Sequence, residues 1–206
     1  DMNLQAKQTG IVGEIAHTHQ FEKGKLSSGY RISNTAISND VVNLLGASQY
    51  SVNYLQQYLY TEISGKKEKL SYRLGIGLTN IHNKSAETTQ DDWAPTPKLV
   101  LSYDLGKNQS LRLTSSYTSN SPWASALSSN VTQIVPNIVQ RGNPYLKSQH
   151  LFRNNFIYSY GGKNVDFNLN AFYNIVDKYF AQIFEADSET NGYALTYQNE
   201  KKKKKG

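Results

Sequence analysis

The sequence has no cysteine, few prolines and no long apolar run. Without cysteine, the chain can form neither disulfides nor thiolate metal sites. No run approaches the ~18 apolar residues that a membrane-spanning helix needs, so no such helix is predicted. The prolines lie within or next to two long polar segments, 81–96 and 119–149; they are Pro95, Pro97, Pro122, Pro136 and Pro144. Because proline cannot donate to a β-ladder, we expect these two segments to lie outside central strands.

Net positive charge is also small once the end of the chain is set apart. The formal net charge is +6, and Lys201–Lys205 supply five of these charges, which leaves 6 − 5 = +1 for residues 1–200. A basic footprint therefore does not extend over the domain, and no nucleic-acid partner is predicted. We expect one domain over residues 1–200 and a solvated lysine-rich tail over 201–206. The polar stretch Asp1–Gly10 predicts no signal peptide there.

What the chain does have is alternation. In the segment 70–79, every second residue from Leu70 to Leu78 is apolar, and the residues between them are small or polar. Side chains alternate between the two faces of a strand, so this pattern predicts a β-strand with one apolar face. A helix would scatter the same residues around its axis, and Gly75 and Gly77 would weaken it.

The same pattern recurs along the chain and predicts about nine strands. The further segments lie near 11–21, 25–35, 51–64, 99–105, 111–117, 152–160, 165–175 and 193–198. Most are longer than the ~5–6 residues usual in soluble domains and match the ~9–11 residues of a membrane strand. The predicted fold class is all-β: an antiparallel up-and-down meander of about nine long strands, forming part of an outer-membrane β-barrel.

Four Gly-Lys pairs mark the short connections of this meander: Gly24-Lys25, Gly65-Lys66, Gly106-Lys107 and Gly162-Lys163. We interpret each glycine as the residue that accepts a positive φ in a tight turn. Long polar segments, 36–50, 81–96 and 119–149, separate these turns. Short turns at one end and long loops at the other are typical of outer-membrane barrels. Within the last segment, residues 130–139 are expected to form a short helix or an inward-packed loop.

Alternation alone does not show which face of the predicted sheet meets water. A soluble antiparallel β-sheet binding module, with its apolar faces packed together, therefore remains the alternative. It predicts low exposure for Leu74, Leu101, Phe156 and Leu169. In the barrel hypothesis these residues meet lipid or detergent, and polar residues face the lumen: Arg73, Asp104, Arg112, Asp166, Asn168 and Asn170.

No constellation for catalysis or metal binding stands out, so an enzyme is not predicted and no cofactor is implied. None of the Gly-Lys pairs is followed by Ser or Thr, as a phosphate-binding loop requires. His17 and His19 would share a strand face, but no nearby carboxylate cluster completes a metal site. Asp91-Asp92 is interpreted as a solvated acidic pair, and His82 and His150 as residues without an evident partner.

The segment Gln140-Arg141-Gly142-Asn143-Pro144-Tyr145-Leu146-Lys147 carries a family resemblance. It resembles the Gly-Asn-Pro-x-Leu-Lys-Pro-Glu stretch in the barrels of TonB-dependent receptors, especially those of Bacteroidetes, where it ends a long loop and leads into a strand. Residues 53–60, a Gly-Lys turn and residues 70–78 are similar to a mid-barrel hairpin of these receptors. The resemblance covers roughly residues 25–200. Ser148-Gln149 stands where the family usually has Pro-Glu.

The resemblance implies a segment of a larger receptor in the bacterial outer membrane. Such receptors bind a nutrient, for example a glycan or a siderophore, at their outer loops and import it. The implied partners are membrane lipid, the remaining barrel and plug, TonB through the part of the receptor outside this chain, and a small-molecule or glycan ligand. On the outer loops we expect ligand contacts from Trp93, Trp123, Arg141, Asn143 and Tyr145.

Overall fold

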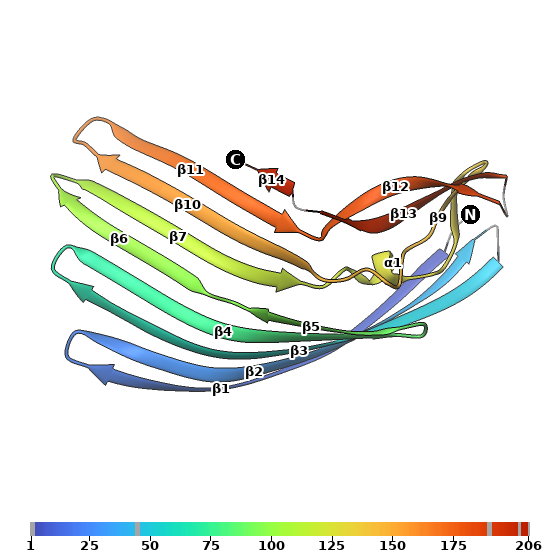
Figure 1. The fold of residues 1–206 in the computed structure, drawn as a ribbon, viewed down its shortest axis with the longest axis horizontal. Coiled ribbons are helices and arrows are strands. Elements are labelled where there is room, and N and C mark those ends of the chain that lie inside the picture. The colour runs from blue at the N-terminus through green and yellow to red at the C-terminus, as the bar shows by residue number, and fades with distance from the viewer. Residues whose placement is uncertain (1–2, 44–45, 189–190, 202, 206) are drawn as a thin grey trace.

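A computed structural model describes residues 3–43, 46–188, 191–201 and 203–205, and most of them belong to two β-sheets. The large sheet has ten strands, in the order β1-β2-β3-β4-β6-β7-β10-β11-β14, with β5 also paired to β4 (Figure 1). Its strands are β1 (Asn3–Phe21), β2 (Gly24–Asn43), β3 (Gly46–Lys67), β4 (Leu70–Ser85), β5 (Thr89–Pro95), β6 (Lys98–Gly106), β7 (Gln109–Asn120), β10 (Gln149–Gly161), β11 (Asp166–Asp177) and β14 (Lys203–Lys205).

All pairings in the large sheet are antiparallel, and its strands follow one another across the sheet in the order in which they occur in the sequence up to β11, with β5, β8 and β9 outside this path. The predicted meander is therefore confirmed. The short turns β1–β2, β3–β4, β6–β7 and β10–β11 lie together at one end, on the left of Figure 1. We call this the turn end and the opposite end the loop end. The predicted lysine tail differs in one respect, because Lys203–Lys205 pair with Asn174–Val176 of β11.

The second sheet lies at the loop end and has four strands in the order β12-β13-β9-β8. These are β12 (Tyr179–Asp187), β13 (Gly192–Glu200), β9 (Ile138–Gln140) and β8 (Thr132–Val135). The pairing of β13 with β9 is parallel, unlike the others. A short helix, α1 (Ala124–Leu127), precedes β8. In the part of the chain that the structure describes, no helix is long and apolar enough to cross a membrane.

Three predicted loops are corrected by these bounds. Segment 36–50 is largely strand, because β2 continues to Asn43 and β3 begins at Gly46. Segment 81–96 contains the end of β4 and all of β5. Segment 130–139 forms the β8–β9 pair instead of a short helix or a loop. Strand β12, which the alternation did not predict, follows β11 after Lys178.

The Gly-Lys pairs mark the turn end, but the predicted role of their glycines holds for only one of them. Gly106 has a positive φ of 80°. The other described residues with positive φ at these turns are not glycines, namely Glu68, Lys107 and Asn108. Gly24 and Gly65 are instead partners in the β2–β3 register, so each lies inside a ladder.

Near the turn end, the two faces of the large sheet differ sharply in polarity. One face carries exposed apolar side chains that are adjacent in the strand register; its most exposed members include Ile15, Leu59, Ile76, Leu78 and Leu169. On β4 this face is apolar from Leu70 to Leu78, close to the ~9–11 residues with which a tilted strand crosses a bilayer. We call this surface the apolar band and its side of the sheet the outward face.

The exposure of the apolar band contradicts the soluble alternative. Leu74 is 44% exposed, Phe156 39% and Leu169 52%, and Leu101 is half-buried. A soluble sandwich would bury all four. They share one face in the strand register, as a lipid-facing surface requires.

The opposite, inward face is polar near the turn end. Arg73 and Lys98 both lie within ion-pair distance of Glu62, and the Tyr60 hydroxyl donates to Glu14 at 3.0 Å. Alternation along the paired strands puts the predicted lumenal residues on this same face: Arg73, Asp104, Arg112, Asp166, Asn168 and Asn170. The predicted division of these residues between two opposite faces of the sheet is therefore confirmed.

Candidate functional site

At the loop end, a compact unit covers the inward face of β2 and β3. It consists of α1, the segment 128–148 with β8 and β9, and the β12–β13 hairpin, and we call it the loop cluster (Figure 1). Its buried core joins Ala126, Leu127, Leu146 and Phe180 to Val52 of β3. The half-buried residues Ile37, Tyr50 and Tyr54 pack against the same core. The loop end thus has an apolar interior like that of a soluble domain.

The Gly-Asn-Pro segment holds the parts of the loop cluster together through hydrogen bonds. The Gly142 amide donates to the Ser128 carbonyl at 2.7 Å, and the Asn143 amide donates to the Ala126 carbonyl at 2.6 Å. The Asn143 side chain donates to the Tyr197 carbonyl at 2.9 Å, while its oxygen accepts from the Tyr145 amide at 2.9 Å. One asparagine therefore connects α1, β13 and its own turn.

Position 142 has no room for a side chain, because the backbone at the end of α1 approaches it closely. A Cβ at this position would lie 2.5–2.6 Å from three carbonyl oxygens at the end of α1, well inside van der Waals contact. The glycine of the motif therefore lets the segment pass directly beneath α1.

Two further contacts attach this segment to the β12–β13 hairpin. The Lys147 amide donates to the Asn199 side chain at 2.8 Å, and Asn199 donates back to the carbonyls of Lys147 and Lys178, both at 2.9 Å. Arg141 lies 3.8 Å from Asp187, at the far end of β12. Leu146, only 1% exposed, fills the core between these attachments.

Trp123 lies at the edge of this core. Its ring meets Phe180 and Tyr197 edge-on, with centroids 5.6 and 5.3 Å away. The Tyr197 hydroxyl accepts from Gln182 at 2.9 Å and lies 3.2 Å from the Gln140 side-chain nitrogen. Trp123 nevertheless remains 46% exposed, so it presents an aromatic surface to the outside.

Tyr54 connects the large sheet to the loop cluster, away from the apolar band. Its hydroxyl donates to the Pro122 carbonyl at 3.0 Å. Burial, and to a smaller degree the neighbouring Tyr50, raise the pKa of Tyr54 well above its usual value. The hydroxyl therefore stays protonated and keeps donating over a wide pH range.

A polar cavity of about 450 Å³ opens between the β4–β5 hairpin and the Gly-Asn-Pro segment. Gln90 holds its two walls together by donating to the Pro144 carbonyl at 2.9 Å. Acidic, basic, amide and aromatic groups line it, and the lining residues that bear them are Gln90, Asp91, Asp92, Tyr145, Lys147 and Lys178. Tyr145 is 68% exposed, so its ring is available to a ligand.

A hydrogen-bonded chain supports one wall of this cavity. Asp92 lies 3.0 Å from Nε2 of His150, and Nδ1 of the same ring lies 2.6 Å from the Tyr117 hydroxyl. Ser119 donates to Asp92 at 2.7 Å. Similarly, His82 lies 2.9 Å from Asp91. The interpretation of both histidines as unpartnered is therefore wrong, because each meets an aspartate from another strand. Asp92 is largely buried, whereas the Asp91 side chain is 55% exposed, so the solvated interpretation fails for Asp92 and not for Asp91.

The five residues predicted to contact ligand do not form a single group. Tyr145 lines the cavity, whereas Arg141 and Asn143 are engaged in contacts that hold the loop cluster together. Trp123 lies on the aromatic edge of the core. Trp93 is opposite Asn80 in the β4–β5 register, which puts it on the outward face with Leu78. A contact between these residues and a ligand stays a prediction.

Sequence reasoning missed most of the cavity lining. Gln90 and Lys178 come from two separate places in the chain and belong to no motif, and Lys147, although inside the Gly-Asn-Pro segment, was not predicted to contact a ligand. The only available signal was the Gly-Asn-Pro resemblance, which marked the wall that contains Tyr145. Among the described residues, no group of three or more His, Asp or Glu side chains is arranged to hold a metal ion.

Comparison with known proteins supports the geometry. Residues 1–205 match a family model described as the outer membrane protein beta-barrel family. A search of curated proteins finds no match. Among solved structures, the chain is similar to the copper transporter OprC, with a TM-score of 0.73 and 13% identity over 96% of this chain and 34% of that one.

Two receptors of iron-binding molecules are also similar. The ferric enterobactin receptor PfeA of Pseudomonas aeruginosa, in complex with enterobactin, gives a TM-score of 0.67 and 15% identity over 97% of this chain and 32% of that one. The siderophore receptor PirA of Acinetobacter baumannii gives a TM-score of 0.61 and 11% identity over 97% of this chain and 33% of that one. This chain thus spans about a third of each, and at these identities the likeness shows the fold. The predicted resemblance to TonB-dependent receptor barrels is confirmed.

Proposed function

Because the chain belongs to the outer membrane protein beta-barrel family, we propose that it forms part of a nutrient receptor that binds its ligand at the loop end and imports it across the outer membrane. Its location is the bacterial outer membrane. The observation that carries the proposal is the polar cavity beneath Tyr145, at the end of the barrel wall that carries the loop cluster.

The edges of the large sheet support a larger barrel. On its free side, β1 meets no described strand, and β11 is covered only at Asn174–Val176. Unpaired backbone groups at a lipid-facing edge cost several kcal/mol each, so open sheets do not span membranes. Further strands of the receptor would pair with both edges and close the barrel. The solved structures, about three times longer than this chain, have room for such strands.

The connections between strands are short at one end of the large sheet and long at the other, and this difference supports an orientation of the barrel wall in the membrane. Short turns face the periplasm in outer-membrane barrels, and longer loops face outward. In this orientation the four Gly-Lys turns are periplasmic and the loop cluster is extracellular. The plug and the segment that engages TonB would come from the part of the receptor outside this chain.

The cavity favours a hydroxyl-rich ligand such as a glycan or a siderophore. Carboxylates and amides accept hydrogen bonds from hydroxyl groups, and lysines donate to ligand oxygens. An exposed tyrosine ring adds an apolar face with a polar tip. These groups suit binding without catalysis, and we assign no enzymatic step. In this proposal Tyr145 contacts the ligand, Trp123 and Trp93 offer further aromatic surface, and Arg141 and Asn143 position the segment that presents Tyr145.

Titration calorimetry on the purified chain in detergent tests this assignment. The probes are a linear glucan oligosaccharide and a ferric catecholate siderophore. We expect one of them to bind, and Tyr145→Ala to weaken binding about tenfold, since an aromatic contact is worth ~1 kcal/mol or more. Tyr193→Ala is the matched control, because Tyr193 is 58% exposed in the loop cluster but does not line the cavity. Binding of neither probe, or equal losses in both variants, would contradict the proposal.

A further inference from the structure

Two further polar hollows lie on the inward face of the large sheet, between the cavity beneath Tyr145 and the turn end. The first has a volume of about 260 Å³ and is lined in part by Thr79. The second, of about 380 Å³, is lined in part by Tyr60. Tyr58 and Lys98 line both of them, so the two hollows adjoin. We call them the middle hollow and the turn-end hollow.

The cavity beneath Tyr145 and these two hollows follow one another along β4. Ile81 lines the cavity, Thr79 lines the middle hollow and Gly75 lines the turn-end hollow. An even number of residues separates these positions, so they share the inward face of the strand. From Ile81 to Gly75 the strand advances about 20 Å at the usual rise per residue. The inward face therefore presents three polar hollows in series, from the loop end toward the turn end.

A pair of stacked tyrosines separates the two lower hollows. The ring centroids of Tyr58 and Tyr60 are 5.1 Å apart, and their planes lie within 20° of each other. Tyr60 leans across Gly29 of β2, where an added Cβ would lie 2.7 Å from its hydroxyl oxygen, and Tyr58 leans across Gly77 of β4. The two glycines thus give the rings room on the neighbouring strands. Both tyrosines are half-buried, so part of their aromatic surface is open to the lumen.

The charges around the turn-end hollow cancel. Two acids and two bases line it, namely Glu14, Glu62, Arg31 and Lys98. Glu62 lies 3.3 Å from Arg73 and 3.8 Å from Lys98. The hollow therefore favours a neutral polar ligand over an anion. Carboxylates accept hydrogen bonds from hydroxyl groups, basic side chains donate to oxygens, and an aromatic ring packs against the apolar face of a sugar.

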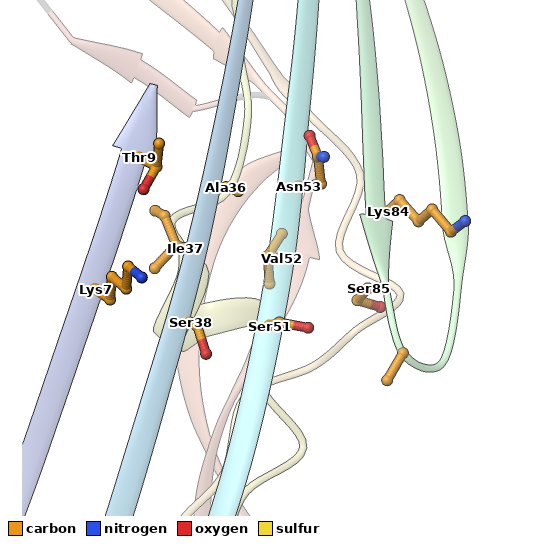
Figure 2. Close-up of a pocket in the computed structure, with 11 residues that line it drawn as sticks. Lys7, Thr9, Ala36, Ile37, Ser38, Ser51, Val52, Asn53, Lys84 and Ser85 are labelled. Carbon is orange, nitrogen blue, oxygen red and sulfur yellow. The ribbon is translucent and has the colours of Figure 1, made fainter. Parts of the chain in front are cut away.

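A hollow on the opposite, outward face has different chemistry (Figure 2). It has a volume of about 590 Å³, and Figure 2 shows Lys7 on β1 at one side and Lys84 on β4 at the other. Neither a carboxylate nor an aromatic ring is among the described residues that line it. Stacked rings with balanced charges therefore belong to the inward hollows, on the side of the wall that an imported ligand would pass.

From this arrangement we infer that the Tyr58–Tyr60 pair is a second sugar-binding subsite, which a neutral oligosaccharide reaches from the cavity beneath Tyr145 during import. The two rings pack against the apolar face of a sugar, and Glu62 and Lys98 form hydrogen bonds with its hydroxyl groups. The inference rests on the proposed import function. It goes beyond that function by naming the ligand as a neutral oligosaccharide and by assigning its path to the inward face of β3 and β4.

Saturation-transfer NMR on the purified chain in detergent tests the subsite, with a linear glucan oligosaccharide as the probe. The measurement uses a Tyr145→Ala background, in which the outer cavity is weakened. Adding Tyr58→Leu and Tyr60→Leu should raise the apparent Kd of the remaining site about 30-fold, because each lost aromatic contact contributes roughly a fivefold factor. The control adds Tyr103→Leu and Tyr160→Leu, which remove two outward rings that are 44% and 38% exposed. Its Kd should stay within about twofold of the background, whereas equal losses in both pairs would overturn the subsite.

Two milder changes separate the role of the rings from an effect on the fold. Tyr58→Phe with Tyr60→Phe keeps both rings, so the Kd should stay within about threefold of the background, and a loss as large as that of the leucine pair would overturn the stacking contact. Lys98→Gln alters an exposed side chain and should raise the Kd about threefold through one lost hydrogen bond, whereas unchanged affinity would contradict its contact with the sugar. Circular dichroism spectra should match the background in every variant.

The pattern of binding distinguishes this inference from the proposed function. If Tyr145→Ala alone abolishes all glucan binding, the ligand stops at the outer cavity, and the subsite is overturned while the proposed receptor function stands. A ferric catecholate siderophore, which is anionic, should displace the glucan poorly from the Tyr58–Tyr60 pair. Equal displacement would overturn the assignment to a neutral sugar. Binding of the siderophore without any glucan binding would overturn the subsite and leave a siderophore receptor.

Discussion

The turn end and the loop end of the large sheet use the same strands in opposite ways. Near the turn end, the outward positions of β3, such as Leu59 and Ile63, are apolar and exposed, while inward Glu62 lies among charged residues. Near the loop end, outward Ser51 and Asn53 are polar, and inward Val52 is buried in the loop cluster. The apolar face of the strand therefore changes sides along its length.

The same reversal occurs on both neighbouring strands. On β2 the apolar positions pass from outward Ile32 to inward Ile37, and on β4 they pass from outward Leu78 to inward Ile81. Lipid is the apolar surrounding at one end, and the loop cluster is the apolar partner at the other. In the proposed orientation, the reversal marks where the bilayer ends and the extracellular wall begins.

The largest expected difference between the two ends concerns a leucine deletion. Leu146→Ala removes a side chain that is 1% exposed in the loop cluster, and it should lower the free energy of unfolding of this region by about 3 kcal/mol, within the usual range for a core leucine. Leu169→Ala on the apolar band, where Leu169 is 52% exposed, should cost under about 1 kcal/mol in detergent. Urea unfolding followed by tryptophan fluorescence measures both, and equal costs would remove the distinction between the two ends.

Alanine substitutions at two glycines compare how closely the backbone is packed in the two regions. Gly142→Ala places a methyl group against the carbonyls at the end of α1 and should cost about 1–3 kcal/mol, as overpacking does. The control is Gly75→Ala on β4, where the new Cβ would meet its nearest neighbours at an ordinary 3.6 Å. Thermal unfolding in detergent should show a lowered midpoint for the first variant and little change for the second. A larger drop in the midpoint for Gly75→Ala would contradict the role of the Gly-Asn-Pro segment in holding the loop cluster together.

The sequence predicted the turn end well because its information is local. Alternation from Leu70 to Leu78 specifies a strand and its two faces without reference to any partner. The same alternation failed where the apolar phase reverses. At Ile37 and Ile81 the period of two continues, but the apolar positions change parity, so the predicted strands 25–35 and 70–79 stop too early.

The candidate site was harder to predict from the sequence, for a related reason. The Gly-Asn-Pro resemblance identified the wall of the cavity, but its opposite wall comes from the β4–β5 hairpin, more than 50 residues away in sequence. Asp92 and His150 are 58 residues apart; Asp92 was interpreted as part of a solvated pair and His150 as unpartnered. Such contacts follow from the register of several strands and the docking of the loop cluster, which no single segment specifies.

The smallest effect concerns the hydrogen bond between the two regions. Tyr54→Phe removes the donor to Pro122 and should lower the stability of the loop cluster by about 1 kcal/mol at neutral pH. Burial raises the pKa of Tyr54, so the unfolded state, with a pKa near ~10, loses its proton first as pH rises. The stabilisation is therefore fully present below pH ~10 and declines above it. Urea midpoints between pH 7 and 11 should fall less steeply above pH ~10 in Tyr54→Phe than in the parent chain, while Tyr193→Phe, which alters an exposed side chain, should follow the parent. Equal slopes in all three proteins would mean that Tyr54 does not couple the barrel wall to the loop cluster.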